Sequence, residues 1–172
     1  LIAAGFKSVG AVEKDVVAGN SYLQNFPETR IRLFGSTQGD LTKISPQHLA
    51  FLVGTEGIGE LDLLVAGPPC QGFSRIGRGK LLSLNDREDA LLNDPRNNLY
   101  QFAIASLQAL RPRVFLFENV AGMLHIRGHN MVEAVCSAVS KCGYNVRCAL
   151  LNSAWYGVPQ TRERVFVIGF RN

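Results

Sequence analysis

A cysteine that directly follows a short apolar run is the first feature of this sequence that could do chemistry. Residues 61–66 are followed by Gly67-Pro68-Pro69, which predicts a buried strand that ends abruptly, and Cys70 comes next. Because ligands of open α/β sheets bind at the carboxyl ends of strands, a thiol held there is well placed for nucleophilic attack. A small cysteine that only packs is the alternative. The setting Pro-Pro-Cys-Gln-Gly-Phe-Ser favours the nucleophile, because packing alone needs no such setting.

A carboxyl group follows a second apolar run. Residues 114–117 form a continuous apolar run, which is typical of a strand covered on both faces, and Glu118 and Asn119 follow it. If this strand and the strand before Cys70 are parallel neighbours, their carboxyl ends meet at one edge of the sheet. The sequence therefore predicts a carboxyl group beside a thiol.

Three segments together resemble motifs of the cytosine-C5 DNA methyltransferase family. Residues 68–74 resemble its nucleophile motif, 117–120 its Glu-Asn-Val motif and 160–164 its Gln-x-Arg-x-Arg motif. One such motif would be a weak signal, but three in the family's order are highly specific. The resemblance implies a DNA (cytosine-5-)-methyltransferase. Such an enzyme transfers a methyl group from S-adenosylmethionine to C5 of a flipped-out cytosine through a covalent cysteine adduct.

The resemblance also implies roles for individual residues. Cys70 is the expected nucleophile, and Glu118 is expected to contact N3 and the exocyclic amino group of the base. Arg164, supported by Arg162, is expected to contact the base O2 or the flanking phosphate. The other expected substrate contacts are Gln71, Ser74, Asn119, Val120 and Gln160. Because a base inside a duplex cannot be reached, the expected partner is double-stranded DNA from which the target base is flipped out.

The cofactor contacts are expected near the start of the chain. Glu13 follows the predicted strand 6–12, where a carboxylate can accept hydrogen bonds from both ribose hydroxyls; a surface charge is the alternative. By resemblance, Asp40 would bind the adenine amino group and Leu41 would pack on the ring, whereas an Asp that caps the following turn is the rival interpretation. Lys14 stands where family members often carry a larger apolar or aromatic residue. The remaining expected contacts of S-adenosylmethionine are Pro69 and Leu99.

The hydrophobic pattern predicts an α/β fold, and the resemblance makes it a Rossmann-like class I methyltransferase sheet with helices on both faces. Residues 34–41 are predicted to be a loop, and Cys136, Cys142 and Cys148 to be core. The polar segment 74–98, with its glycines and cations, is interpreted as a lid that closes on a phosphate backbone; a solvated insertion is the alternative. Strands are predicted at 6–12, 61–66, 114–117, 144–151 and 165–170, and helices at 16–26, from Ser45-Pro46, at 99–110 and at 129–142.

Two parts of the family pattern are missing from this sequence. The first motif belongs to a central strand between the strand before Glu13 and the strand before Cys70, and a target-recognition region would follow Asn172. Residues 1–172 are therefore predicted to be a partial catalytic domain that lacks the first strand and the target-recognition region. By itself this fragment is expected to be inactive.

Composition bears on which partners, membrane segments and cysteine sites the protein can have. The 172 residues carry a formal net charge of +4, which permits a polyanionic partner without requiring one. No apolar run is long enough to span a bilayer, and the cysteine spacing predicts neither a zinc site nor a disulfide framework. The expected location is the cytoplasm of a bacterium, or the nucleus if the source is eukaryotic. A cognate restriction endonuclease is considered only as a cellular counterpart, not as a bound partner.

Three other functions stay open on the sequence. A relative that methylates tRNA would use the same reaction, although Gln71-Gly72-Phe73-Ser74 is more similar to the DNA-modifying members. A non-catalytic scaffold that binds DNA would be expected to have lost Cys70 or Glu118, and both are present. A cysteine hydrolase would need a histidine base, and the sequence offers no compelling one.

Overall fold

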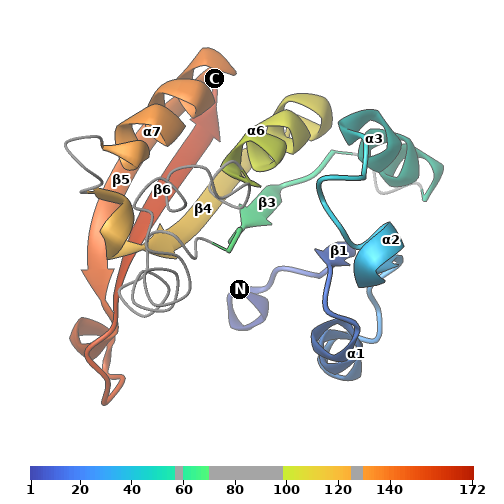
Figure 1. Ribbon diagram of the computed structural model, residues 1–172, viewed down its shortest axis with the longest axis horizontal. Coiled ribbons are helices and arrows are strands. Elements are labelled where there is room, and N and C mark those ends of the chain that lie inside the picture. The colour runs from blue at the N-terminus through green and yellow to red at the C-terminus, as the bar shows by residue number, and fades with distance from the viewer. Residues whose placement is uncertain (57–59, 70–98, 125–129) are drawn as a thin grey trace, which may run out of the picture. The chain divides into compact units, whose positions relative to one another are not determined.

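The computed structural model describes residues 1–56, 60–69, 99–124 and 130–172 (Figure 1). The chain divides into two compact units, Leu1–Glu60 and Leu61–Asn172, and each has its own sheet. Cys70, Gln71 and Ser74 lie outside the described residues, as does the predicted lid 74–98. In the described part of the chain, no helix is long and apolar enough to cross a membrane.

The first unit is built around a parallel β-α-β arrangement. Its elements are η1 (Ile2–Ala4), β1 (Gly10–Glu13), α1 (Val16–Asn25), β2 (Ile31–Phe34), α2 (Gly35–Gln38) and α3 (Pro46–Thr55). Strands β1 and β2 pair in parallel, with Glu13 opposite Phe34 at their carboxyl ends. Helix α1 begins after Asp15, whose side chain accepts a hydrogen bond from the backbone N–H of Ala18. Ser45 caps α3 in the same way.

The second unit contains a four-stranded mixed sheet. Its elements are β3 (Leu63–Ala66), α6 (Leu99–Leu110), β4 (Val114–Val120), η3 (Ala121–Leu124), α7 (Met131–Lys141), β5 (Tyr144–Asn152), η4 (Ser153–Tyr156) and β6 (Glu163–Arg171). The strand order is β3-β4-β6-β5; β3 and β4 are parallel, and β6 is antiparallel to both of its neighbours. The pairing of β3 with β4 confirms that the two strands expected to carry the thiol and the carboxyl group are neighbours.

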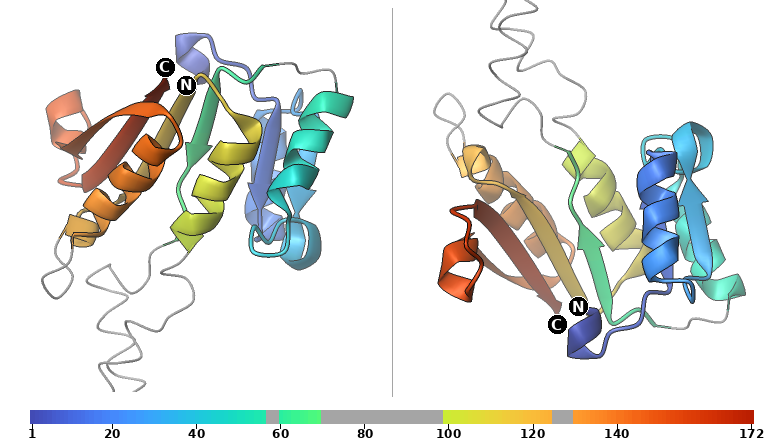
Figure 2. Two further views of the ribbon diagram at one scale, coloured as in Figure 1. Left: turned by 90° about the horizontal axis from the view of Figure 1, so that it is seen from above. Right: turned by 90° about the horizontal axis from the view of Figure 1, so that it is seen from below.

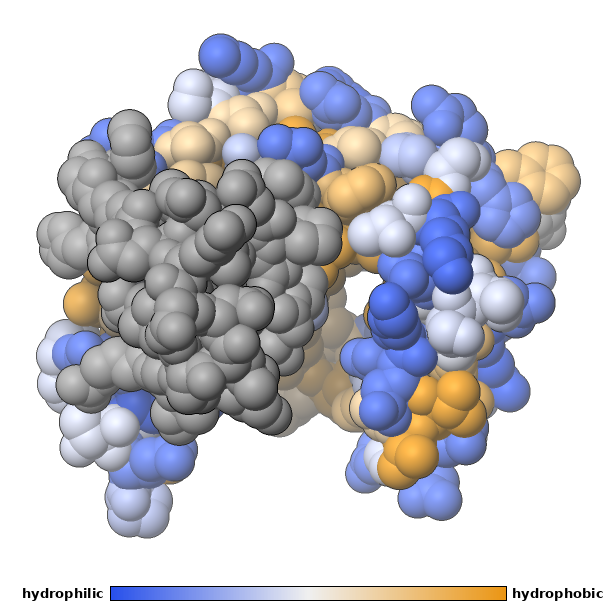
Figure 3. All heavy atoms as spheres, in the orientation of Figure 1, coloured by the Kyte–Doolittle hydropathy of each residue, from blue (hydrophilic) through white to orange (hydrophobic). Residues whose placement is uncertain are grey.

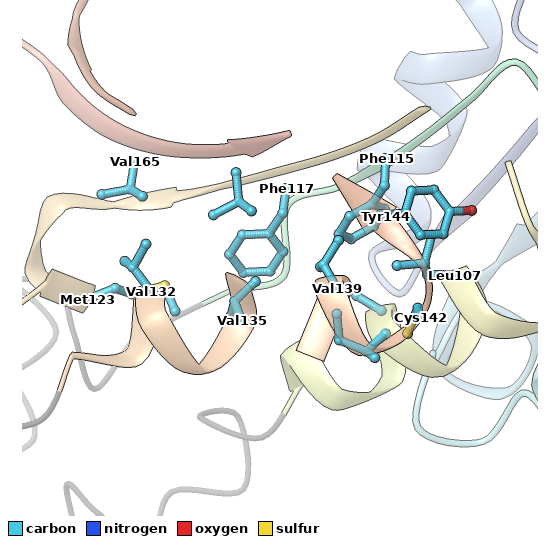
Figure 4. Packing of buried hydrophobic residues seen from close by; sticks show 13 residues of the cluster. Leu107, Phe115, Phe117, Met123, Val132, Val135, Val139, Cys142, Tyr144 and Val165 are labelled. Atoms are coloured by element: carbon cyan, nitrogen blue, oxygen red, sulfur yellow. The ribbon is translucent and has the colours of Figure 1, made fainter. Parts of the chain in front are cut away.

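One face of this sheet holds the hydrophobic core. Side chains of β4 alternate between buried and half-buried, so that Phe115 and Phe117 point into the core. Helices α6 and α7 lie on the same face of the sheet (Figure 2). Figure 4 shows the side chains of α7 packed against those of β4 and β6. The members of this core that are almost fully buried are Leu107, Phe115, Phe117, Met123, Val135, Val139, Val165 and Val167. This packing fixes the strands whose ends carry the predicted site.

Three sequence-based predictions were wrong in detail. The segment 34–41 is not all loop, because Gly35, with a φ of 92°, lets the chain turn from β2 directly into α2. Strand β4 continues past residue 117 to Val120, so Glu118 and Asn119 lie on the strand rather than after it. Cys148 is exposed, because it lies on the outer strand β5 among exposed residues.

In the parts of the chain that the structure describes, β1, β2, β3 and β5 each have one edge without a partner strand. β1 pairs only with β2, and β3 pairs only with β4. The absent central strand stays a prediction. So do helices on both faces, because α6 and α7 cover a single face of the second sheet and the other α-helices belong to the first unit.

Candidate active site

Glu118 and Arg164 form an ion pair on the four-stranded sheet. In the antiparallel register of β4 and β6, Glu118 lies opposite Phe166, and Val120 lies opposite Arg164. Glu118 and Arg164 are therefore diagonal neighbours on one face, a separation that long side chains can span. Arg164 Nε lies 3.0 Å from Glu118 Oε1, and the two side chains are 21% and 35% exposed, respectively. Both groups thus hold each other in place and remain accessible to a ligand.

The guanidinium of Arg164 has donors to spare. Its Nη1 donates a hydrogen bond of 2.7 Å to the backbone carbonyl of Glu163. Within the described part of the chain, Nη2 has no recorded partner. Because the guanidinium is planar and permanently charged, it can donate to a carbonyl or phosphate oxygen while it keeps its contact with Glu118.

Asn119 connects the ends of β3 and β4. Its side chain is 5% exposed, and Nδ2 donates a hydrogen bond of 3.0 Å to the carbonyl of Pro68. Gly67, one residue before Pro68, lies close to Glu118: a Cβ added to Gly67 would be 3.6 Å from Glu118 Oε2. The backbone that leads to Cys70 is therefore held beside the Glu118 carboxylate, although Cys70 itself is outside the described residues. Pro69, the last described residue of this segment, is exposed.

A closed turn between β5 and β6 positions Gln160 and Arg162. The Asn152 side chain accepts a hydrogen bond from the backbone N–H of Arg162, and Ser153 Oγ donates to the carbonyl of Gln160. Both predicted site residues are exposed. Among the residues that the structure describes, the Arg162 guanidinium has no hydrogen bond or ion pair recorded. Arg162 is thus free to meet an anion, while its backbone is fixed.

Glu13 and Asp40 lie in the first unit and differ in how their carboxylates are used. Glu13 is exposed, and its Oε1 accepts a hydrogen bond from the backbone N–H of Asp15. Asp40 is only 6% exposed; its Oδ1 accepts from both the backbone N–H and the hydroxyl of Thr42, and its Oδ2 lies 2.8 Å from Lys14 Nζ. The structure therefore gives Asp40 the turn-capping role that the sequence offered as the rival interpretation.

The structure brings some of the predicted site residues together and not others. Glu118, Asn119, Val120 and Arg164 lie on adjoining ends of β4 and β6. Leu99 is half-buried at the start of α6, and Leu41 is half-buried in the first unit. Because the two units are not placed relative to each other, no distance joins Glu13, Asp40 or Leu41 to the Glu118–Arg164 pair. In the described residues, no group of three His, Cys, Asp or Glu side chains could hold a metal ion.

Asp40 has two side-chain partners, Lys14 and Thr42, that the sequence analysis did not predict. The Asp-x-Thr spacing of residues 40–42 is typical of a side chain that binds the backbone two residues on, so the sequence contained that signal. The approach of Lys14 depends on how the end of β1 meets the segment after α2, which no local pattern gives.

The whole chain matches one protein family. The description of that family is C-5 cytosine-specific DNA methylase, and the match covers residues 1–172. The chain belongs to this family. The resemblance inferred from the three motifs is thereby confirmed.

Named relatives of this C-5 cytosine methylase chain agree with the family match. The type II methyltransferase M.DdeI of Desulfomicrobium norvegicum is 33% identical over 172 residues, covering 98% of this chain and 36% of that relative. M.AquIA of Picosynechococcus is also 33% identical, covering 98% of this chain and 65% of the relative. The chain thus spans between about a third and two thirds of the length of these two relatives.

Solved structures confirm the α/β fold. An E. coli prophage protein, solved as a candidate DNA modification methyltransferase, superposes with a TM-score of 0.71 at 28% identity. That match covers 98% of this chain and 41% of the solved chain. A mutant of Spodoptera frugiperda DNMT2 gives a TM-score of 0.62 at 27% identity, over 95% of this chain and 42% of the solved one.

The buried contacts of Asp40 predict a pH-dependent stability. Hydrogen bonds from Lys14 and then from Thr42 lower the pKa of Asp40 from 3.8 to about 2. Since the folded pKa lies below the unfolded value, this stabilisation is fully present above that unfolded value and is lost as the pH falls towards 2. Because the Lys14 side chain is 66% exposed, solvent screens the pair and this stabilisation is about 1 kcal/mol. Urea unfolding between pH 5 and 2 should show a smaller loss of stability for Asp40→Asn than for the parent chain, whereas equal losses would contradict this assignment.

Gly39 is predicted to be intolerant of any side chain. A Cβ at this position would lie 2.0 Å from the backbone oxygen of Glu13, which cannot move without displacing the end of β1. We expect Gly39→Ala to destabilise the first unit by about 3 kcal/mol, at the upper end of overpacking effects, and to separate Glu13 from Asp40. Thermal unfolding would measure this, with Gly54→Ala as the control, because nothing lies within 4 Å of a Cβ there. Equal stability of both variants would contradict the close approach.

Proposed function

We propose that the protein carrying this chain is a DNA (cytosine-5-)-methyltransferase that acts on a flipped-out cytosine through a covalent cysteine adduct. The observation that carries the proposal is the Glu118–Arg164 ion pair, at 3.0 Å, beside the strand that leads to Cys70. A carboxyl group and a guanidinium with a spare donor suit the polar edge of a cytosine, which presents both donors and acceptors. The match to the C-5 cytosine-specific DNA methylase family supports methylation of cytosine C5, and the relatives are named as type II methyltransferases.

The chemistry needs a nucleophile because carbon 5 of cytosine is unreactive by itself. The Cys70 thiolate adds to carbon 6, which makes carbon 5 electron-rich. S-adenosylmethionine, when bound, supplies the electrophilic methyl group. Glu118 holds N3 and the exocyclic amino group, and Arg164 holds O2 or the flanking phosphate. A base, a role assigned to none of the described residues, then takes the proton from carbon 5. The electron pair of that C–H bond re-forms the double bond between carbons 5 and 6 and expels the Cys70 thiolate.

The residues proposed to hold the cofactor fit it in part. Glu13 Oε2 has no recorded partner in the described part of the chain and is exposed, so it can accept a ribose hydroxyl. Both oxygens of Asp40 are already engaged, so an adenine amino group would have to share Oδ1 or displace Lys14 from Oδ2. We assign Glu13 the ribose contact and keep Asp40, Leu41, Pro69 and Leu99 as proposed contacts of S-adenosylmethionine.

We propose that both units are parts of one catalytic domain whose first, central strand and target-recognition region are supplied by other parts of the polypeptide. The coverage of the relatives supports this proposal, because the chain matches only 36% of M.DdeI and 65% of M.AquIA. Residues 1–172 by themselves are then expected to be inactive. Double-stranded DNA is the proposed partner, and a cognate restriction endonuclease and a cytoplasmic or nuclear location stay predictions.

A mechanism-based trap tests the function. The protein at its natural length is mixed with S-adenosylmethionine and a sequence library of duplexes that contain 5-fluorocytosine. Because fluorine cannot leave as a cation, a working enzyme should stall as a covalent protein–DNA adduct, which intact mass spectrometry detects. Transfer RNA with the same base serves as the comparison. An adduct with tRNA alone, or no adduct although S-adenosylmethionine binds, would overturn the DNA proposal.

A further inference from the structure

Three large side chains stand exposed between β5 and β6. Trp155, Tyr156 and Val158 are 69%, 66% and 45% exposed, and we call these three residues the aromatic ledge. Trp155 is the single tryptophan of the 172 residues. Single exposed apolar residues are ordinary, but neighbouring ones with two aromatic rings are typical of a contact surface.

The aromatic ledge follows the same end of the sheet, where β5 stops and β6 starts, as the one at which the Glu118–Arg164 pair lies. Strand β5 ends at Asn152, paired with Glu163, and β6 begins there. Strand β4 ends at Val120, opposite Arg164, one residue further along β6. Helix η4 extends beyond this end of the sheet (Figure 1). A ligand that reaches the Glu118–Arg164 pair from that end of the sheet therefore also comes near the aromatic ledge.

The backbone under the ledge is held rigidly. Asn152 Oδ1 accepts hydrogen bonds from the backbone N–H groups of both Ala154 and Arg162. The backbone N–H of Ser153 donates to the carbonyl of Arg162, and that of Val158 donates to the carbonyl of Ser153. The aromatic rings are thus presented on a closed turn, so little backbone order needs to be gained when a partner binds.

Charge and polarity favour a nucleic acid as the partner. Arg162 and Arg164 lie at the end of β6 next to the ledge, and Glu163 is the single acidic residue between Tyr144 and Asn172. On the face drawn in Figure 3, the end of the molecule where η4 lies is mostly pale to blue, which means that its residues are polar or only weakly apolar. Aromatic faces beside arginines are the combination that binds unpaired bases.

We propose that the aromatic ledge is a stacking surface for an unstacked nucleotide of the DNA, next to the target cytosine. The inference rests on the proposed function, because removal of a base from a duplex unstacks its neighbours and exposes their faces. Trp155 and Tyr156 would cover such a face, while Arg162 would meet the adjacent phosphate. In this way the ledge would favour the opened form of the DNA over the closed duplex.

Binding to bulged and fully paired DNA tests the ledge. In the protein at its natural length, Trp155→Ala with Tyr156→Ala should weaken binding to a labelled duplex with central unpaired nucleotides by about 5- to 30-fold. Binding to the fully paired duplex should change much less. Trp155→Phe keeps a ring face and should stay within about threefold of the parent. Phe51→Ala, which removes a ring that is 64% exposed in the first unit, is the matched control.

The adduct assay separates the two proposals. If the parent protein forms the 5-fluorocytosine adduct but the ledge variants bind bulged DNA as the parent does, the ledge proposal is overturned and the function stands. If no adduct forms while binding to bulged DNA still depends on Trp155, the function fails and the nucleic-acid surface stands. If the variants instead change only the oligomeric state, the ledge is an interface between copies of this chain, and the stacking proposal is wrong.

Discussion

Replacement of Cys70 by alanine is expected to abolish the covalent adduct with 5-fluorocytosine DNA. The proposed reaction begins when the thiolate of Cys70 adds to carbon 6, and none of the described residues at that strand end is another cysteine. Cofactor binding should survive, because the proposed contacts to the ribose come from the first unit. Intact mass spectrometry measures the adduct, and equilibrium dialysis with labelled S-adenosylmethionine measures the cofactor.

A second cysteine variant makes that result specific. Cys148 is exposed on β5 and therefore reachable by DNA, whereas Cys142 is buried. Cys148→Ala should form the adduct at the rate of the parent protein. An adduct that persists in Cys70→Ala and disappears in Cys148→Ala would mean that a surface thiol had reacted, and the assignment of the nucleophile would be wrong.

The helices of ten or more residues could be predicted from the sequence because they carry their own start and stop signals, whereas the short α2 has no side-chain cap and was predicted to be a loop. Asp15, Ser45 and Asn130 each precede an apolar-periodic segment, and each caps the helix that follows. The predicted helix 99–110 is found with the same bounds. These signals act within one or two turns, so they do not depend on the rest of the fold.

Contacts between distant segments could not be predicted in the same way. The Glu118–Arg164 contact depends on the antiparallel register of β4 and β6, and a shift of one residue would turn Arg164 to the other face. The strand pattern of residues 144–151 led to the prediction that Cys148 is core, but β5 is the outer strand of the sheet and Cys148 is exposed. Burial of Cys148 is decided by the order of the strands, which the local pattern does not contain.

The motif residues form a candidate site through side-chain contacts rather than through sequence proximity. The motifs predicted that a carboxyl group, an amide and a guanidinium would act together, and the structure places two of them in an ion pair. The third, Asn119, binds the carbonyl of Pro68 and thereby fixes the start of the segment that carries Cys70. The same residues thus hold the proposed site together and present its reactive groups.

Glu118→Gln is expected to lower the rate of methyl transfer by about 10²- to 10⁴-fold, the range associated with a positioned acid–base group. The amide keeps the size of the side chain and can still accept a hydrogen bond from Arg164 Nε. It cannot change protonation state, so it cannot deliver a proton to N3 of the base as a carboxyl group can. The fold should therefore survive while the chemistry fails, and thermal unfolding together with single-turnover methylation of the duplex distinguishes the two.

The Glu118–Arg164 ion pair predicts how the loss of methylation rate in Glu118→Gln combines with the loss in an Arg164 variant. Glu133→Gln, on the exposed side of α7, should leave the rate unchanged, since an amide can still accept the hydrogen bond from Asn130. Arg164→Gln should be strongly impaired by itself, because Glu118 then loses its partner and the base loses a donor. If Glu118 and Arg164 act as one unit, the double variant should be little slower than the slower single variant. Fully multiplicative losses would instead mean that the two residues act independently, and that their contact at 3.0 Å has no part in catalysis.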